Sequence, residues 1–261
     1  MTAAVVGALE AALVSPLRDV LLSMADDEAV LGWTDSEWTG IAPLLEEDVA
    51  MSSLAQDELG HAQALYGLLA GLPGGADPDA IAYDREPADY RHARLLDHGR
   101  GDWAMTIARR FLYETADALR LDALATGSWT PLAELVGKIA REERYHRMHI
   151  GAWLTRLAEA RGEPRDRLLV ALEVLGPDAG TVFTPLPGES ALVEAGILAA
   201  PMAELETRWR AALEPDLRRL DLPLPPPTAD RVSGRTAHGS AFADLHAAYT
   251  SVRRSDPGAT W

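Results

Sequence analysis

The chain has no cysteine among its 261 residues. Disulfides, thiolate nucleophiles, zinc fingers and iron–sulfur clusters are therefore excluded, and any bound metal must take carboxylate or imidazole ligands. Basic residues are also scarce, because 24 Lys and Arg stand against 40 Asp and Glu and leave a formal net charge of -16. This balance argues against nucleic acid and against an anionic membrane surface as the main partner.

Long apolar runs are missing as well. The first twenty residues lack a basic leader and are interrupted by Glu10, Pro16 and Arg18, a pattern typical of neither a signal peptide nor a membrane span. We therefore expect a cytoplasmic protein with no membrane partner. Gly-rich phosphate-binding motifs of the Rossmann or P-loop kind are absent too, so no nucleotide or flavin site is expected, and electrons for any redox chemistry would come from a partner.

Apolar residues make up 48% of the chain and recur at helical spacing, whereas no segment alternates with the period of a strand. The sequence therefore predicts an all-α fold. The four long helices are expected over residues 16–33, 43–72, 102–126 and 131–161. Two short connections and one crossover of about 29 residues between the second and third helices predict a ferritin-like four-helix bundle.

The helical pattern weakens after residue 161. We expect the bundle to occupy residues 1–161 and a helical C-terminal extension, residues 162–261, to pack on the bundle or on a partner subunit. Shorter helices are expected at 164–175, 190–214 and 238–253, and a short helix from about residue 3. Asp102 is suited to cap the third long helix.

Two Glu-x-x-His motifs lie on the core-facing stripes of the bundle. Glu58 and His61 share one face of the second helix, and Glu143 and His146 share one face of the fourth. Residues three apart on a helix are neighbours, so each pair can address a common ion. A single motif of this kind is weak evidence for a metal site. Both of these motifs, however, lie in line with the apolar residues that must face the core.

The first and third helices each place one Glu in the same kind of stripe, Glu28 and Glu114. Glu28 precedes Glu58 by 30 residues and Glu114 precedes Glu143 by 29, so two antiparallel hairpins bring all these side chains to one layer. This is the ligand pattern of the di-iron and di-manganese carboxylate proteins. We therefore predict a metal site formed by Glu28, Glu58, His61, Glu114, Glu143 and His146.

Four buried carboxylates repel one another unless cations balance them, and two divalent ions do so. Asp57 and Glu142 are the expected partners of the ligating imidazoles, because a carboxylate can accept the free N–H of such a ring. The alternative is a buried salt-bridge network with Arg109, Arg110, Arg141 or Arg144 that binds no metal. The similar spacing in the segment Asp89 to His92 lies in the crossover, outside the stripes, and is expected to be solvated.

Several segments resemble a known family. The run Glu46 to Ala50, the segment Gln56 to Ala62, the motif Arg144 to His146 and the C-terminal Trp261 are similar to the C subunits of bacterial phenylacetyl-CoA epoxidases. The resemblance extends over nearly the whole chain and is densest around the two Glu-x-x-His motifs.

This resemblance implies a component of a multicomponent monooxygenase that epoxidises the ring of phenylacetyl-CoA in aerobic phenylacetate degradation. It also implies a homologous A subunit that carries the catalytic di-iron centre, and a reductase subunit that supplies electrons. The C subunit of that family is regarded as structural, and in some members ligand positions are replaced. The present sequence keeps all six.

Two hypotheses therefore stand. The chain either binds its own di-metal centre, which is di-iron or alternatively di-manganese or mixed, or it is a non-catalytic partner that stabilises the A subunit. An independent ferritin-like oxidase or iron-handling protein is a further alternative.

Overall fold

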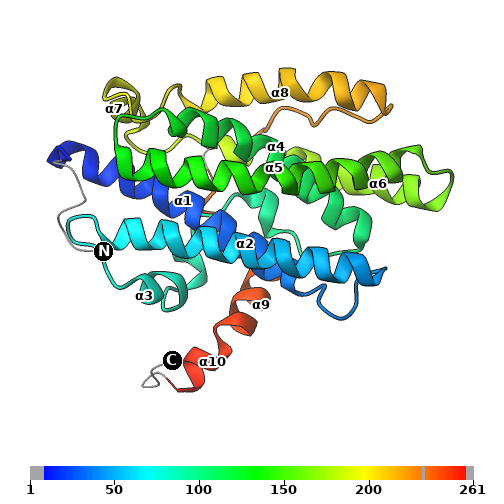
Figure 1. Ribbon diagram of the computed structural model, residues 1–261, viewed down its shortest axis with the longest axis horizontal. Helices are drawn as coiled ribbons and strands as arrows, with labels where there is room; N and C mark the ends of the chain where they lie inside the picture. The colour runs from blue at the N-terminus through cyan, green and yellow to red at the C-terminus, as the bar shows by residue number, and fades with distance from the viewer. Residues whose placement is uncertain (1–8, 231–232, 257–261) are drawn as a thin grey trace.

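The computed structural model describes residues 9–230 and 233–256 of the chain. Over these residues every regular element is a helix, so the predicted all-α class is confirmed. Four long helices pack as two hairpins, α1 with α2 and α4 with α5 (Figure 1). The arrangement is that of a ferritin-like bundle with additional helices.

The four long helices span Ala11–Ser36 (α1), Leu45–Ala70 (α2), Trp103–Ala125 (α4) and Thr130–Glu159 (α5). Asp102 caps α4 as predicted, because its carboxylate accepts a hydrogen bond of 2.9 Å from the Met105 amide. The predicted start of the first helix at Pro16 is wrong. The helix begins earlier and keeps Pro16 inside, where its buried ring packs against Gly188.

The crossover between α2 and α4 contains one short helix, α3 (Pro78–Tyr83), and two 3-10 turns, η1 (Pro87–Asp89) and η2 (Arg94–Asp97). The expectation that the segment Asp89 to His92 is solvated holds for Asp89, which is exposed, but is wrong for Tyr90 and His92, which are fully buried. A helix near the C-terminus covers them, and the ring of its Phe242 lies 5.2 Å from that of Tyr90 and 4.2 Å from that of His92.

Most of the helices that follow α5 pack on the bundle. The elements of this region are α6 (Glu163–Leu175), the 3-10 segment η3 (Gly176–Phe183), α7 (Glu189–Glu194), α8 (Met202–Arg219), α9 (Ser240–Tyr249) and α10 (Ser251–Ser255). The helices α6 and α8 contact α4, and α9 contacts α1, while α10 contacts α9. In Figure 1, α8 runs along the α4–α5 side, and α9 and α10 extend from the opposite side.

Two of the predicted extension helices are divided. The segment 190–214 forms α7 and α8, because the chain turns at Gly196, whose φ is +68°, and at Pro201. The segment 238–253 forms α9 and α10, which meet at Thr250. The short helix expected from about residue 3 falls largely outside the described residues.

The buried carboxylate of Asp27 on α1 joins the bundle to the extension. It accepts hydrogen bonds from Arg120 of α4 at 2.6 Å, from Arg235 at 2.9 and 3.0 Å, and from the Ala93 amide of the crossover at 2.7 Å. Burial raises the pKa of Asp27, but the two guanidinium groups outweigh it and hold the pKa below its ordinary value. Three separate chain segments are thereby fixed to one side chain of α1.

We expect Arg235→Ala to lower the free energy of unfolding by roughly 3 kcal/mol, because it removes one cation from a buried charge pair. Urea denaturation monitored by circular dichroism measures this change. The matched control is Arg219→Ala, whose partner Asp216 is exposed and 3.8 Å away, and which should change stability by less than about 0.5 kcal/mol. Equal effects of the two substitutions would contradict the assigned role of Arg235.

Candidate metal centre

The structure brings the six predicted ligands into one buried layer. Glu28 comes from α1, Glu58 and His61 from α2, Glu114 from α4, and Glu143 and His146 from α5. All six are at most 5% exposed. We call this set of six residues the carboxylate–histidine cluster.

Potential ligand atoms within the cluster form two overlapping groups, in each of which the atoms lie within 4.8 Å of one another. One group contains Glu28, Glu58, His61 and Glu143, and the other contains Glu58, Glu114 and His146. Two ion positions that share a carboxylate are the arrangement of a di-metal carboxylate centre.

Both imidazoles turn Nδ1 toward the interior of the cluster. His61 Nδ1 lies 3.1 Å from Glu28 Oε2 and 3.6 Å from Glu143 Oε1. His146 Nδ1 lies 3.1 Å from Glu143 Oε1 and 3.4 Å from Glu58 Oε1. The two ring centroids are 6.3 Å apart. Glu58 and Glu143 each have a carboxylate oxygen within 4 Å of Nδ1 of both rings, so these two carboxylates lie between the imidazoles.

The outer nitrogen of each ring contacts a carboxylate from the opposite hairpin. His61 Nε2 is 2.8 Å from Glu142 Oε2, and His146 Nε2 is 3.2 Å from Asp57 Oδ2. These are the two residues that the sequence suggested as partners of the imidazoles. An N–H donated outward at Nε2 leaves the Nδ1 lone pair free to bind an ion inside the cluster.

Several inward atoms of the cluster have no hydrogen-bond partner. They are Glu58 Oε2, Glu114 Oε2, both carboxylate oxygens of Glu143 and His146 Nδ1. The last of these is near Glu143 Oε1 without the alignment of a hydrogen bond. Buried polar atoms are normally paired, and oxygen and imidazole donors suit iron and manganese. The residues therefore fit two divalent ions.

Arg110 of α4 borders the cluster, and its role was only partly anticipated. Its guanidinium donates to Glu114 Oε1 at 2.7 Å and to Glu58 Oε1 at 2.6 Å, and it also contacts Asp35. The salt-bridge alternative is thus realised at one edge of the cluster. Asp35, which the sequence did not single out, offsets the charge of Arg110. The four glutamates, when ionised beside neutral imidazoles, therefore still need cations to balance them.

Two further residues shape the cluster and were not predicted. Tyr113 donates a hydrogen bond of 2.8 Å to Glu28 Oε1. Gly32 allows α1 and α2 to approach closely, because a Cβ at this position would lie 2.9 Å from Leu59 Cγ and 3.1 Å from Glu58 Cβ. Gly32 lies one turn after Glu28 on the same helix. This spacing is the sequence feature that relates Gly32 to the cluster.

Burial raises the pKa of Glu28 well above its ordinary value, and Glu58 adds to the effect. Burial also raises the pKa of Glu143, and raises that of Glu114 to about 8 against the opposing charge of Arg110. Burial lowers the pKa of each imidazole, but the glutamates outweigh it and raise the values to about 12 for His61 and about 11 for His146. Without metal, the cluster therefore retains protons, which ions must displace.

The fold and the cluster together define a ferritin-like protein with a carboxylate and histidine core. The sequence matches the family described as phenylacetic acid catabolic protein over residues 8–261, so the chain belongs to that family. It is also similar to the C subunit of the 1,2-phenylacetyl-CoA epoxidase of Escherichia coli (strain K12). The two are 27% identical over 241 residues, which cover 92% of this chain and 97% of the relative. The resemblance stated from the sequence is thereby confirmed.

Among the helices of the described residues, none is both long enough and apolar enough to cross a membrane.

We expect the metal-free Glu114→Gln variant, prepared with a chelator, to be more stable than the metal-free wild type. The difference in the free energy of unfolding should grow as pH rises from about 5 to about 9. A carboxyl whose folded pKa is raised contributes stability below its ordinary pKa, and this contribution is lost as pH rises through about 8. Urea denaturation across this range measures the difference. The exposed control Glu134→Gln should show no such trend. A pH-independent difference for Glu114→Gln would count against the assignment.

Proposed function

We propose that this chain is the C-type subunit of a phenylacetyl-CoA ring epoxidase, the partner of a homologous A subunit, and that it binds a di-iron centre of its own. Similarity to a C subunit over nearly the full length of both chains supports the first part. The observation that carries the second is the complete set of six buried ligands converging from four helices, with unpartnered atoms directed inward.

The cluster assigns a role to each of its residues. His61 and His146 are held by Glu142 and Asp57 so that Nδ1 would be available to an ion inside the cluster. Glu28, Glu58, Glu114 and Glu143 would supply the carboxylate ligands; Glu58 is common to both groups of potential ligand atoms, and Glu143 Oε1 lies near both imidazoles. Carboxylate and imidazole ligands also suit manganese, so a di-manganese or mixed centre has the same ligands.

When bound, a di-iron centre supplies oxygen activation for insertion of one oxygen atom into an aromatic ring. The protein's own contribution is to exclude water from the layer, since every ligand is buried, and to hold protons on Glu28, Glu114, Glu143 and the two imidazoles in the absence of metal. Because the sequence has no flavin or nucleotide motif, a separate reductase subunit is the proposed source of electrons.

We expect about two iron ions per chain after anaerobic reconstitution with Fe²⁺ and desalting. Glu58→Ala and Glu143→Ala should each reduce the count to less than about one, because Glu58 belongs to both groups of potential ligand atoms and Glu143 Oε1 lies near both imidazoles. Metal analysis by mass spectrometry gives the stoichiometry. Glu134→Ala, at an exposed position of α5, is the control and should retain the wild-type value.

Iron at only a small fraction of one equivalent in the folded wild-type chain would end the proposal of a metal centre. The assignment as a structural partner subunit would survive that result, since it depends on the similarity rather than on metal.

We expect the chain to co-purify with a homologous A-type subunit and to support oxygen consumption that depends on phenylacetyl-CoA and on a reductase. If its own centre takes part, Glu58→Ala and Glu143→Ala in this chain should lower the rate at least about tenfold while the subunits remain associated. Loss of activity only when the partner's ligands are changed would place the chemistry in the partner. Turnover by this chain alone would instead favour an independent oxidase.

A further inference from the structure

The two carboxylate oxygens of Glu28, the lone glutamate of α1, have different surroundings. Oε2 faces the carboxylate–histidine cluster and lies 3.1 Å from His61 Nδ1. Oε1 instead accepts a hydrogen bond of 2.8 Å from the hydroxyl of Tyr113 on α4, a side chain that is fully buried. One oxygen of Glu28 is thus engaged by the protein, and the other is left for an ion.

Arg120 determines the direction of the Tyr113 hydroxyl. Its Nη2 lies 3.2 Å from the phenol oxygen, and because a guanidinium only donates, that oxygen accepts from Arg120. The phenol proton is then directed at Glu28 Oε1. Burial and the charge of Glu28 raise the pKa of Tyr113 well above its ordinary value, so the phenol keeps this proton. The hydrogen bond to Glu28 therefore has one fixed direction.

Arg120 is itself held on two sides. Its Nε donates to Asp117 Oδ1 at 2.8 Å within α4, and its Nη1 donates to Asp27 Oδ2 on α1 at 2.6 Å. Asp27 also accepts two hydrogen bonds from Arg235 of the C-terminal extension. Buried side chains therefore connect the extension to the cluster in the order Arg235, Asp27, Arg120, Tyr113 and Glu28.

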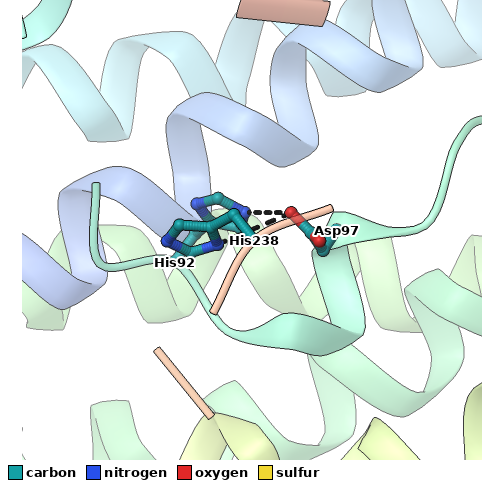
Figure 2. A group of neighbouring side chains, drawn as sticks. All are labelled: His92, Asp97 and His238. Carbon is teal, nitrogen blue, oxygen red and sulfur yellow. Dashed lines mark hydrogen bonds and ion pairs between the residues drawn. The ribbon is translucent and has the colours of Figure 1, made fainter. Parts of the chain in front are cut away.

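The segment that follows Arg235 is fastened to the crossover. His92 Nε2 donates a hydrogen bond of 3.1 Å to Asp97 Oδ1, and the other oxygen of Asp97 accepts from the Gly239 amide. His238 stacks on His92 with ring centroids 4.1 Å apart (Figure 2), and its Nε2 donates to a backbone carbonyl of the crossover at 2.9 Å. These contacts hold in place the part of the extension from which Arg235 reaches Asp27.

The lone glutamate of the other hairpin is held in a similar way. Glu114 Oε1 accepts a hydrogen bond of 2.7 Å from Arg110 Nε, while Glu114 Oε2 is buried without a hydrogen-bond partner. In both hairpins, α4 thus supplies the donor that engages one oxygen of the lone glutamate. Arg110 also donates to Glu58, whereas among the described residues the Tyr113 hydroxyl donates to Glu28 and to no other member of the cluster.

We propose that Tyr113 is a positioning residue for the metal centre: by engaging Glu28 Oε1 it leaves Glu28 to bind an ion through Oε2, and Arg120 keeps its hydroxyl in that direction. This inference rests on the di-metal centre proposed above. Donors that orient a metal ligand commonly account for roughly 10- to 100-fold in metal affinity. Glu28 belongs to one of the two groups of potential ligand atoms and not to the other, so the effect of Tyr113 is confined to one ion.

The test is a titration of the full chain with Mn²⁺, in which the electron paramagnetic resonance signal of free Mn²⁺ gives the number and the affinity of bound ions. We expect the wild-type chain to bind about two ions. Tyr113→Phe should weaken the binding of one ion at least about tenfold and leave the other unchanged. Unchanged binding of both ions would overturn the proposal, and so would equal weakening of both, which a general loss of packing produces.

Tyr66→Phe is the matched control. Tyr66 is also a buried tyrosine that donates to a carboxylate of α1, at 2.6 Å from Asp26 Oδ1, but Asp26 lies outside the cluster. This variant should lower the free energy of unfolding, as Tyr113→Phe does, and keep both Mn²⁺ affinities at the wild-type values. If Tyr66→Phe weakened one ion as much as Tyr113→Phe, the assigned role of Tyr113 would be wrong.

A double-mutant cycle with Glu28→Gln shows whether Tyr113 acts through Glu28. In the Glu28→Gln background, Tyr113→Phe should change the remaining Mn²⁺ affinity by less than about twofold, because the ligand that Tyr113 orients is already lost. A further tenfold loss in that background would overturn the proposal. Failure of the metal centre itself is a different result, since the wild-type chain would then bind no Mn²⁺, and it would overturn both proposals.

Discussion

The constraint on which the structure depends is the burial of acidic side chains on α1. Between Ser23 and Asp35 this helix is covered on all sides, and the covered stretch contains Asp26, Asp27, Glu28 and Asp35. A buried carboxylate is costly unless a cation or several hydrogen bonds meet it. Other segments of the chain supply a charged or hydrogen-bonding partner for each of the four, so the packing of these segments around α1 also pairs its charges.

Asp26 contacts Arg85 of the crossover, Asp27 contacts Arg120 and Arg235, and Asp35 contacts Arg110. Glu28 differs, because it faces His61 and other glutamates of the cluster rather than an arginine. The one acidic residue of this stretch without a guanidinium partner is therefore the one directed at the proposed ion positions. Within this helix, the proposed metal ligand thus differs from the three acidic residues that form buried ion pairs with arginine.

The parts of the structure that the sequence predicts are those controlled by local spacing. Glu58 with His61, and Glu143 with His146, follow from neighbouring positions on a helix face, and the layer follows from equal spans in two hairpins. The contact of Asp27 with Arg235 joins residues 208 positions apart and has no local signal. His92 was misjudged for the same reason, since its burial depends on Phe242 and His238, which are distant in sequence.

Arg110 illustrates an intermediate case. Its position four residues before Glu114 places it on the same face of α4, so its contact with that glutamate is predictable, whereas its contacts with Asp35 and Glu58 require the helices to be assembled. Burial raises the pKa of Glu58, but Arg110 outweighs it and, with hydrogen bonds to neighbouring residues, holds that pKa well below its ordinary value. Glu58 is thus ionised while Glu28 and Glu143 hold their protons more tightly.

In the proposed metal centre, this difference would leave one ligand charged before any ion is bound. The ionised Glu58 belongs to both groups of ligand atoms, so an arriving ion meets one charged carboxylate that is common to both positions. Glu28, Glu114 and Glu143 would give up their protons on metal binding, because a nearby cation stabilises the charged form of a carboxyl group. Arg110 therefore does not block the cluster. By keeping Glu58 charged in a buried site, it would prepare the one carboxylate that is common to both groups of potential ligand atoms.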